Sequence, residues 1–442
     1  MERFVYLLNY KFSGIKNVEK ILNFSFYKET INNDYNPEPY KVKGIYGTNG
    51  VGKTAVVRSF DILIDIMFNR QYLTDSVNIE MLKNIINKKT NKAFMEVEFA
   101  VGDESLDYTC KYNIEIARVD NEINILSENL LIRNGSYSKN NYEPVYSVKN
   151  GVIDDSIDID STLVESSKNL LLKQTFSSII FKNETLRSLR GKNENMFFAL
   201  LGLIAFHFNV NIHFDTEDDH VSSINRKKIN DMIAEVVQGG NVRDLSTKEI
   251  FSNFVSGEQI PKADKFLSAY EDRLKRATKF IKLFKPELKE ISYERKENKD
   301  YYEITAIKFT YNDYAIDFDY ESCGIKRLFN IFNKLDWACS GGISFVDEID
   351  ANINDVYLQK MIKYFIEYGK GQLCFTSHNL SPMEELNVSK KSIDFITQIN
   401  TVEPWIKSGH RNPIKEYRGG LIKNIPYNID PIDFIGVLGT YE

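Results

Sequence analysis

One octapeptide constrains the fold of this chain more than any other feature. Residues 47–54 read GTNGVGKT and fit the pattern G-x-x-x-x-G-K-[ST]. The apolar stretch Gly44-Ile45-Tyr46 precedes them, and apolar residues at helical spacing follow from Val56 to Met67. Glycines let a backbone wrap closely around phosphate groups, and the following helix adds the positive end of its dipole. The segment predicts a phosphate-binding strand–loop–helix unit and makes an ordinary glycine-rich turn the weaker interpretation.

Each position of the octapeptide has an expected task. Lys53 would place its ammonium group on the β- and γ-phosphates of a nucleoside triphosphate and so contribute to catalysis. The Thr54 hydroxyl would ligate Mg²⁺. Backbone N–H groups would be directed at the phosphates by the remaining binding positions, which are Gly47, Asn49, Gly50 and Gly52. A triphosphate and Mg²⁺ are therefore the expected ligands.

A second segment supplies two neighbouring carboxylates. Residues 343–348 read ISFVDE, a short apolar strand that ends in Asp347 and Glu348. In a parallel sheet the carboxyl end of this strand opens onto the same crevice as the phosphate loop. Asp347 would hold Mg²⁺ through its water shell, and Glu348 would polarise the attacking water as a general base. A buried strand that ends in acids is also a common structural feature, so its pairing with the octapeptide favours the catalytic interpretation.

Two more positions fit the same chemistry. Ser322 and Gly324, in the segment ESCGIKRL, stand where a predicted strand leads into a predicted helix. The start of such a helix binds anions through exposed N–H groups and a hydroxyl, although Ser322 could equally be a simple helix cap. His378 follows a predicted strand, 372–376, at the same sheet edge. It could bond a γ-phosphate and act in hydrolysis, whereas the alternative is a structural histidine.

The order of elements predicts an α/β chain in three parts. Residues 1–214 would contain the phosphate loop and a run of strands, with strands at 3–10, 21–27, 94–100, 108–117 and 123–131 and a buried helix at 196–210. Residues 215–286 would form a helical insertion, whose longest helix, 262–284, carries a coiled-coil-like or bundle seam. Residues 287–442 would hold strands at 288–295, 302–309 and 315–320, followed by alternating helices and strands that indicate a parallel sheet.

Composition excludes several classes of protein. A chain of 442 residues exceeds the ~250–300 at which one core stops growing, which favours two domains or a large insertion. The net charge of −6 argues against binding to nucleic acid by charge alone. Four scattered cysteines argue against a zinc ribbon and indicate a reducing cytoplasm. The start of the chain lacks a signal-peptide layout, and the longest apolar run, 196–206, is too short to cross a bilayer. We therefore expect a cytoplasmic protein without a membrane partner.

Some polar clusters are open to two interpretations. One cluster has a composition that suits metal ions, but its spacing fits no standard zinc site and favours a solvated acidic turn; it comprises His207, His213, Asp215, Asp218, Asp219 and His220. Basic residues gather at 226–228 and at Arg273, Lys275, Arg276, Lys279 and Lys282. They are the wet face of an amphipathic helix or a contact with DNA phosphates or an acidic partner.

The four segments occur in the order and spacing of ABC-type ATPase heads. They resemble the Walker A (47–54), signature (Ser322-x-Gly324), Walker B (345–348) and switch (His378) motifs. The sequence is most similar to the AAA-annotated bacterial ATPases of the OLD and abortive-infection group, which includes ATPase subunits of anti-phage systems such as PARIS, Septu and AbiL. Wording outside the motifs carries the same resemblance: NYKFSGIKNV, SENLLI, YESCGIKRL, FVDEIDANIN and YRGGLIKNIP.

The resemblance implies a P-loop NTPase of the ABC/SMC-head type, with an antiparallel β subdomain and a helical insertion. Residues 1–214 and 287–442 would be the two halves of the ATPase head. ATP and Mg²⁺ would be bound, ATP would be hydrolysed slowly, and subunits would associate head to tail as a dimer or a higher even-numbered oligomer. The segment 322–327 of one subunit would then close over ATP on residues 47–54 of another. The D-loop departs from the family pattern, because Asn354 or Asp355 must serve there, and Gln174 is the candidate for the glutamine loop.

The sequence is compatible with more than one class of function. The first is an ATPase sensor or scaffold of an anti-phage system, which holds a separate toxic effector, such as a nuclease, until a phage-encoded trigger appears. The last third of the 94 residues after Glu348 carries no recognisable nuclease-like constellation, which is why the effector is expected in a partner protein. The second is an SMC-like or recombination-repair ATPase acting on DNA, which would require a coiled-coil arm longer than the seam at 262–284. A transporter ATPase would be more compact, and a purely structural protein would have no need of an intact phosphate loop.

Overall fold

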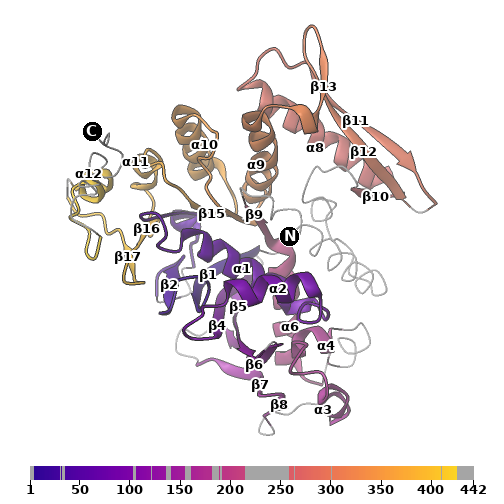
Figure 1. Cartoon of the computed structure of the whole chain (residues 1–442), viewed down its shortest axis with the longest axis vertical. Helices are drawn as coiled ribbons and strands as arrows, with labels where there is room; N and C mark the ends of the chain where they lie inside the picture. The colour runs from indigo at the N-terminus through magenta and orange to yellow at the C-terminus, as the bar shows by residue number, and fades with distance from the viewer. Residues whose placement is uncertain are drawn as a thin grey trace, which may run out of the picture.

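Figure 1 shows the chain as a computed structural model, in which residues 4–29, 31, 35–102, 106–120, 122–135, 141–154, 161–181, 189, 192–214, 258–262, 264–299, 301–409 and 411–425 are described. The expected insertion therefore lies largely outside the described residues, as do the basic trio at 226–228 and the acidic part of the cluster at 215–220. The C-terminal residues 426–442 lie outside them as well.

A six-stranded sheet forms the centre of the molecule, in the order β17-β16-β3-β15-β14-β9. Its members are β3 (Val42–Tyr46), β9 (Val210–His213), β14 (Ile343–Val346), β15 (Gln372–Thr376), β16 (Ile393–Ile396) and β17 (Val402–Pro404). All neighbours are parallel except β17, which runs antiparallel to β16. Every residue of β3, β9, β14, β15 and β16 is buried, as expected for parallel strands covered on both faces. The predicted parallel sheet is therefore present.

An antiparallel sheet of seven strands covers one face of the central sheet together with helices. Its order is β2-β1-β4-β5-β6-β7-β8, with β1 (Phe4–Ser13), β2 (Leu22–Ser25), β4 (Lys92–Gly102), β5 (Leu106–Val119), β6 (Glu122–Asn134), β7 (Glu143–Lys149) and β8 (Val152–Ile153). Inward and outward residues alternate along β6, as in a sheet with one wet face. The predicted strands of the N-terminal half are found within a few residues of their expected bounds.

One core fills the space between these two sheets. Helix α1 (Lys53–Phe68) lies inside it, and Phe60 stacks on Phe345 of β14 with ring centroids 4.0 Å apart. The other helices on this side are α2 (Ser76–Ile85), α3 (Ser161–Ser167), α4 (Phe176–Ile180) and α6 (Glu194–Asn209). Nearly every residue of α1 is buried, which explains why its apolar stripe is wide. The helix that follows the phosphate loop is therefore buried along almost its whole length.

A second core lies on the opposite face of the central sheet. It is built by α8 (Asp264–Lys282), α9 (Cys323–Cys339), α10 (Asp355–Tyr368), α11 (Pro382–Leu386) and α12 (Pro413–Arg418). A small sheet joins them, with β10 (Gln259–Pro261), β11 (Glu290–Glu297), β12 (Tyr301–Thr310) and β13 (Ala315–Asp317). Single-turn 3₁₀ helices span Glu38–Tyr40 and Phe318–Tyr320. In Figure 1, α8 and the small sheet extend away from the body beside α9.

The apolar stripe predicted at 262–284 faces the second core. Its apolar residues are buried in the second core, where α8 packs on β11 and α9: Phe266, Tyr270, Leu274, Ala277 and Ile281. The heptad-like spacing is therefore the core-facing stripe of a helix that packs on a sheet and on α9, and of the two expected uses, a coiled-coil-like or a bundle seam, this packing on α9 is closer to the second. Spacing alone cannot distinguish the two, because a stripe that faces a sheet recurs with nearly the same period.

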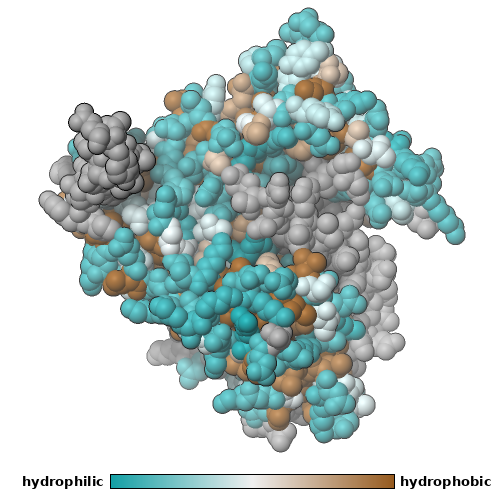
Figure 2. All heavy atoms as spheres, viewed as in Figure 1, coloured by the Kyte–Doolittle hydropathy of each residue, from teal (hydrophilic) through white to brown (hydrophobic). Residues whose placement is uncertain are grey.

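The outer surface is largely polar. Figure 2 shows hydrophilic residues over most of one face, with apolar side chains scattered among them and more frequent toward one end. Exposed apolar residues near α3 and α6 include Leu170, Leu172 and Phe198. Among the helices of the described residues, none is both long enough and apolar enough to span a bilayer.

Candidate active site

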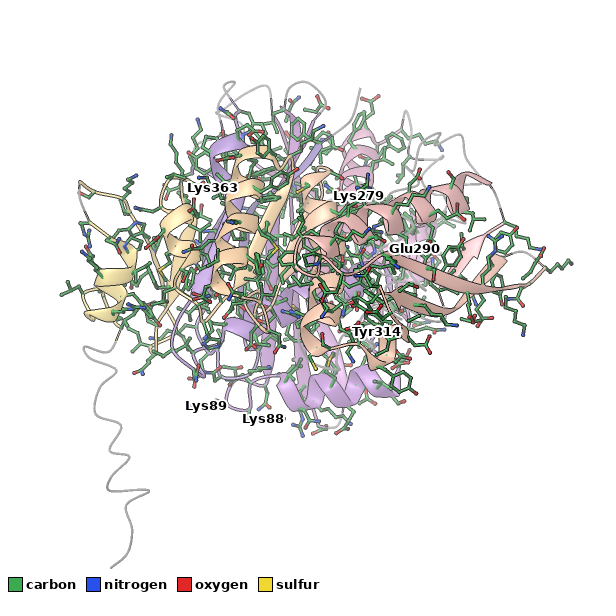
Figure 3. The ribbon with its side chains drawn as sticks, turned by 90° about the horizontal axis from the view of Figure 1, so that it is seen from above. Lys88, Lys89, Lys279, Glu290, Tyr314 and Lys363 are labelled. Atoms are coloured by element: carbon green, nitrogen blue, oxygen red, sulfur yellow. The ribbon has the colours of Figure 1, made fainter. Side chains whose placement is uncertain are left out.

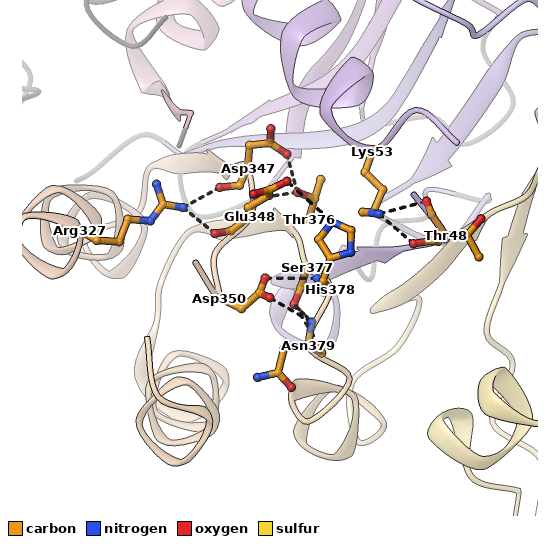
Figure 4. A network of polar contacts seen from close by, with 11 residues as sticks. Thr48, Lys53, Arg327, Asp347, Glu348, Asp350, Thr376, Ser377, His378 and Asn379 are labelled. Atoms are coloured by element: carbon orange, nitrogen blue, oxygen red, sulfur yellow. Dashed lines mark hydrogen bonds and ion pairs between the residues drawn. The ribbon is translucent and has the colours of Figure 1, made fainter. Parts of the chain in front are cut away.

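Three neighbouring parallel strands bring the predicted segments to one edge of the central sheet. Ile45 of β3 pairs with Thr376 of β15, and Phe375 of β15 pairs with Val346 of β14. The residues that follow these strands are the phosphate loop, the Ser377-His378 turn and the Asp347-Glu348 turn. Because parallel strands point their carboxyl ends the same way, all three emerge together. Figure 4 shows Lys53, Asp347, Glu348 and His378 gathered in this region.

The glycine loop has the backbone that a phosphate cradle needs. Gly50 and Gly52 have φ angles of 79° and 111°, which residues with a Cβ rarely adopt. A Cβ at Gly52 would lie 2.7 Å from Val18, and one at Gly47 would lie 2.7 Å from the carbonyl oxygen of Ile396. A Cβ at Gly50 would meet no atom within 4 Å. The loop is therefore packed from behind at two glycines and open at the third.

Lys53 begins α1 and folds its ammonium group back onto the loop. Its Nζ donates to the carbonyl oxygens of Gly47, at 2.8 Å, and of Thr48, at 3.2 Å. Burial lowers the pKa of Lys53, while the carboxylates of Glu348, Asp347 and Asp350, in that order, act in the opposite direction. The ammonium group of Lys53 therefore lies at the phosphate loop and near the Asp347-Glu348 turn. Thr54, the next residue, is half-buried at the same helix start.

A threonine that the sequence did not single out organises the two carboxylates. The Thr376 hydroxyl donates to Asp347 Oδ1 at 2.5 Å and accepts from the backbone N–H of Glu348 at 2.8 Å. The carbonyl of Thr376 accepts from the N–H of Ile349 at 3.0 Å. Asp347 is buried, whereas Glu348 is about 39% exposed and has a left-handed φ of 47°. This geometry turns the two acids in different directions, as their different expected roles require.

His378 lies beside the expected general base. Its Nε2 is 3.7 Å from Glu348 Oε1, and both side chains are partly exposed. The carboxylate of Asp350 accepts from the backbone N–H groups of His378, at 3.3 Å, and Asn379, at 3.1 Å. Asp355, one of the two D-loop candidates, accepts from Asn379 Nδ2 at 2.6 Å. The turn that carries His378 is therefore anchored to the segment that follows the carboxylates.

The signature candidates lie at the start of α9. Ser322 is the N-cap of that helix and accepts from the N–H of Ile325 at 3.4 Å. A Cβ at Gly324 would be 3.4 Å from the carbonyl oxygen of Asn352. Both signature positions are therefore local to the helix start and the D-loop region. Asn354, the other D-loop candidate, caps α10 by accepting from the N–H of Val356 at 3.0 Å.

Arg327 of α9 belongs to the site, although the sequence analysis named only its segment, 322–327, and gave this residue no role of its own. Its Nη2 donates to the carbonyl oxygens of Asp347, at 2.8 Å, and Glu348, at 2.6 Å, and its Nη1 bonds His213 Nε2. Because a guanidinium only donates, His213 accepts through Nε2 and carries its proton on Nδ1. The Lys-Arg pair in the segment was a visible signal, but nothing local told which of the two points inward.

Two other predictions, the glutamine loop at Gln174 and the possible metal cluster that includes His207, concern residues away from this site. Gln174 precedes Thr175, whose hydroxyl donates to the carbonyls of Ile66 and Met67 in the last turn of α1. At about 1.5 Å per residue that turn is about 20 Å from Lys53, so the glutamine-loop prediction for Gln174 is wrong. His207 bonds the carbonyl of Ile64 through Nδ1 at 3.1 Å. No metal-binding group of three or more His, Cys, Asp or Glu side chains occurs among the described residues.

The donors and acceptors present fit a magnesium-bound nucleotide. Gly50 is open on the side where a Cβ would stand, Lys53 is a buried cation at the loop, and α1 contributes the N–H groups of its first turn. A buried carboxylate at Asp347 and the hydroxyl of Thr54 are oxygen ligands, which Mg²⁺ prefers. When bound, the metal would neutralise phosphate charge and orient the phosphates.

Comparisons with known proteins give weak similarities only. No protein-family model matches the sequence, and no curated protein matches it. Three solved structures are SMC head domains, each aligned over 91% of this chain. One, bound to the C-winged helix domain of ScpA, has a TM-score of 0.44 at 11% identity and is covered over 98% of its length. Another, with an extended coiled coil and bound to the C-terminal domain of ScpA from Pyrococcus furiosus, has 0.41 at 11% over 96%. The head domain from Thermotoga maritima has 0.32 at 14% over 100%.

Proposed function

We propose that this chain binds and hydrolyses ATP with Mg²⁺, as an ATPase of the ABC/SMC-head type. The observation that carries the proposal is the convergence of Lys53, Asp347 and Glu348 at the carboxyl ends of β3 and β14, the two parallel strands on either side of β15, although the two acids are almost 300 residues from the lysine in the sequence. His378, 3.7 Å from Glu348, adds a side chain suited to the γ-phosphate. A chance phosphate-loop pattern would not require this arrangement.

The residues divide the work of hydrolysis between them. Lys53 and the N–H groups at the start of α1 would bind and orient the phosphates. Asp347 and Thr54 would hold Mg²⁺. Glu348 would accept the proton of the attacking water, and His378 beside it would bond the phosphoryl group that is transferred. Head-to-tail association would bring Ser322 and Gly324 of a second subunit against the same nucleotide.

Binding and hydrolysis by the purified full chain test this proposal. Titration calorimetry with Mg-ATP should detect uptake by the wild type and its loss in Lys53→Ala. Phosphate release should fall about 100-fold or more in Glu348→Gln, which retains ATP binding, because a general base contributes roughly 10²–10⁴-fold. The exposed residues Lys88 and Glu367 provide matched controls, and Lys88→Ala and Glu367→Gln should behave as wild type. Absence of ATP uptake by the wild type would overturn the proposal.

For the biological role, we propose a sensor or scaffold subunit of a bacterial anti-phage system that controls a separate toxic effector. Support comes from the wording that resembles the OLD and abortive-infection group. Plating phage on cells that carry this gene with its native neighbours tests the role. Lys53→Ala should abolish protection, and a neighbouring protein should co-purify with the wild type. Undiminished protection by Lys53→Ala would contradict an ATP-driven switch.

A DNA-maintenance ATPase is the second candidate, because basic side chains are exposed on α8 and α10, two helices that both pack on α9. Lys279 and Lys282 of α8 and Lys363 of α10 are exposed, and Figure 3 draws Lys279 and Lys363 on the same side of the molecule. DNA binds such surfaces through its phosphates. Strong stimulation of hydrolysis by duplex DNA, reduced in Lys279→Glu, would favour this candidate over the first. Stimulation by a co-purified neighbour, and not by DNA, would favour the anti-phage role.

A further inference from the structure

Arg327 stands in the segment that the family resemblance assigns to the nucleotide of another subunit, yet its side chain faces the interior of its own. It is only 5% exposed. It follows Ser322 by five residues, which is about 7.5 Å along the axis of α9. From there its guanidinium reaches back to the central sheet and not toward the exposed helix start.

Its two carbonyl partners belong to the residues that carry the expected metal ligand and general base. Nη2 donates to the carbonyl oxygens of Asp347, at 2.8 Å, and of Glu348, at 2.6 Å. These carbonyls begin the two consecutive peptide groups on either side of the Glu348 Cα, so their orientation decides where the Glu348 carboxylate points. A guanidinium in this position restrains both peptide groups at once.

The restraint opposes an intrinsic tendency of the backbone. Glu348 has φ 47°, a conformation that costs a non-glycine residue about 1 kcal/mol or more and that persists only where neighbours enforce it. The N–H of Glu348 is held by the Thr376 hydroxyl at 2.8 Å. Its carbonyl is held by Arg327. Strand β15 therefore fixes one side of the residue and helix α9 fixes the other.

His213 in turn orients Arg327. His213 is buried at the end of β9, its Nε2 bonds Arg327 Nη1, and its carbonyl oxygen accepts from the N–H of Asp347 at 2.9 Å. The edge strand thus touches both the arginine and the turn that the arginine holds. The arrangement is continuous from β9 through Arg327 to the peptide groups around Glu348.

We propose that Arg327 is a positioning residue for hydrolysis within its own subunit, which rests on the proposed ATPase function. It holds Glu348 in its left-handed conformation and so aims the general base.

Kinetics of Arg327→Gln and Arg327→Lys test the proposal with the full chain. In Arg327→Gln, kcat for Mg-ATP should fall about 10- to 100-fold, as for other residues that orient a catalytic group, while KM and the calorimetric Kd for Mg-ATP stay unchanged. Arg327→Lys keeps the charge and should recover part of kcat. Arg276→Gln, at a half-exposed arginine of α8 that pairs with Asp336, is the matched control and should retain wild-type values.

Hydrogen exchange without nucleotide gives a second readout that does not depend on turnover. The amides of Glu348 and Ile349 are bonded to Thr376 and should exchange slowly in the wild type. In Arg327→Gln they should exchange roughly tenfold faster, while amides of β15 stay protected. If that variant does not fold, the same comparison is made with Arg327→Lys, where a smaller acceleration is expected.

The outcomes separate this inference from the function on which it rests. A wild-type chain that neither binds nor hydrolyses ATP would overturn the proposed function. A wild type that hydrolyses ATP, with Arg327 variants at the same kcat, would overturn the inference alone. Loss of ATP binding in step with kcat would also overturn it, because a positioning residue of the base acts after binding.

Discussion

Glu128 of β6 is a carboxyl group closed off from water and surrounded by donors. It accepts from the backbone N–H groups of Phe176 and Ser177, from the Ser177 hydroxyl at 2.9 Å, and from Tyr146 and Tyr112 at 2.8 and 3.2 Å. It therefore ties the antiparallel sheet to the start of α4. Burial raises the pKa of the Glu128 carboxyl above its ordinary value of 4.5, although these hydrogen bonds act in the opposite direction.

This raised pKa predicts a dependence of stability on pH. Because the folded-state pKa is above the unfolded value, the contribution of Glu128 is fully present below pH 4.5 and is lost as the pH rises through the folded-state pKa. Urea unfolding of the wild type and Glu128→Gln, from about pH 4.5 to about pH 8, measures it. The free energy of unfolding of the wild type should decline relative to that of the variant. Parallel curves would contradict the prediction.

Single residues also mark the limit of what the sequence could predict. Lys53 and Asp347 were identifiable because each stands in a local pattern whose chemistry depends on adjacent residues. Thr376 and Arg327 act on Asp347 and Glu348 from other elements, at separations of 29 and 20 residues. Their roles depend on β15 lying beside β14 and on the inward direction of one side chain of α9. The alternating helices and strands indicated the parallel sheet, but the contacts that these two side chains make have no signature in the order of residues.

The phosphate loop, as an element, offers a matched pair of glycine substitutions. Gly52→Ala would place a Cβ 2.7 Å from Val18 at φ 111°, so steric overlap adds to backbone strain. Gly50→Ala would meet nothing within 4 Å and suffers only the strain of φ 79°, about 1 kcal/mol.

We therefore expect the two variants to differ in how much stability they lose. Gly52→Ala should lower the free energy of unfolding by about 2 kcal/mol or more, since overlap and strain combine. Gly50→Ala should lower it by only about 1 kcal/mol, yet lose Mg-ATP binding, because the added methyl group occupies the open side of the loop. Urea unfolding and calorimetry measure the two properties. Undiminished ATP affinity in Gly50→Ala would contradict phosphate binding at this position.

Elements were easier to predict than their partners. The expected helices and strands of the described parts occur within a few residues, because periodicity is a property of each segment alone. The spacing of α8 left a coiled-coil and a bundle seam open, and the partners of Tyr270 and Leu274, a helix and a sheet of the second core, are known only from the structure. The domain bounds at 214 and 286 remain predictions, because most of the segment between them lies outside the described residues.

One side chain, that of Gln372, joins the central sheet to the antiparallel sheet by bonding a backbone N–H and carbonyl as a neighbouring strand would. Gln372 begins β15 of the central sheet, and its amide bonds the backbone of Leu7 in β1 of the antiparallel sheet. Oε1 accepts from the Leu7 N–H at 2.6 Å, and Nε2 donates to the Leu7 carbonyl at 2.9 Å. The residue is buried, so this pair of bonds joins the two sheets away from water.

Removal of that link should destabilise the protein without touching the candidate site. Gln372→Leu leaves the N–H and the carbonyl of Leu7 buried and unpaired, which costs about 1–3 kcal/mol for each group. The free energy of unfolding should therefore fall by about 2–6 kcal/mol in urea titrations. Gln359→Leu, at a half-buried glutamine that bonds the carbonyl of Ser381, is the control and should cost less. Equal losses in the two variants would contradict the special role of Gln372.

At position 348, the left-handed backbone favours one residue for stability and the chemistry requires another. Glycine would be more comfortable at φ 47°, so Glu348→Gly should melt at a higher temperature in scanning calorimetry while its turnover is lost. Selection for folding alone would discard the acid. A lineage in which turnover no longer mattered would therefore be expected to drift to glycine or asparagine here, and retention of the glutamate in a given gene signals that the chemistry is still in use.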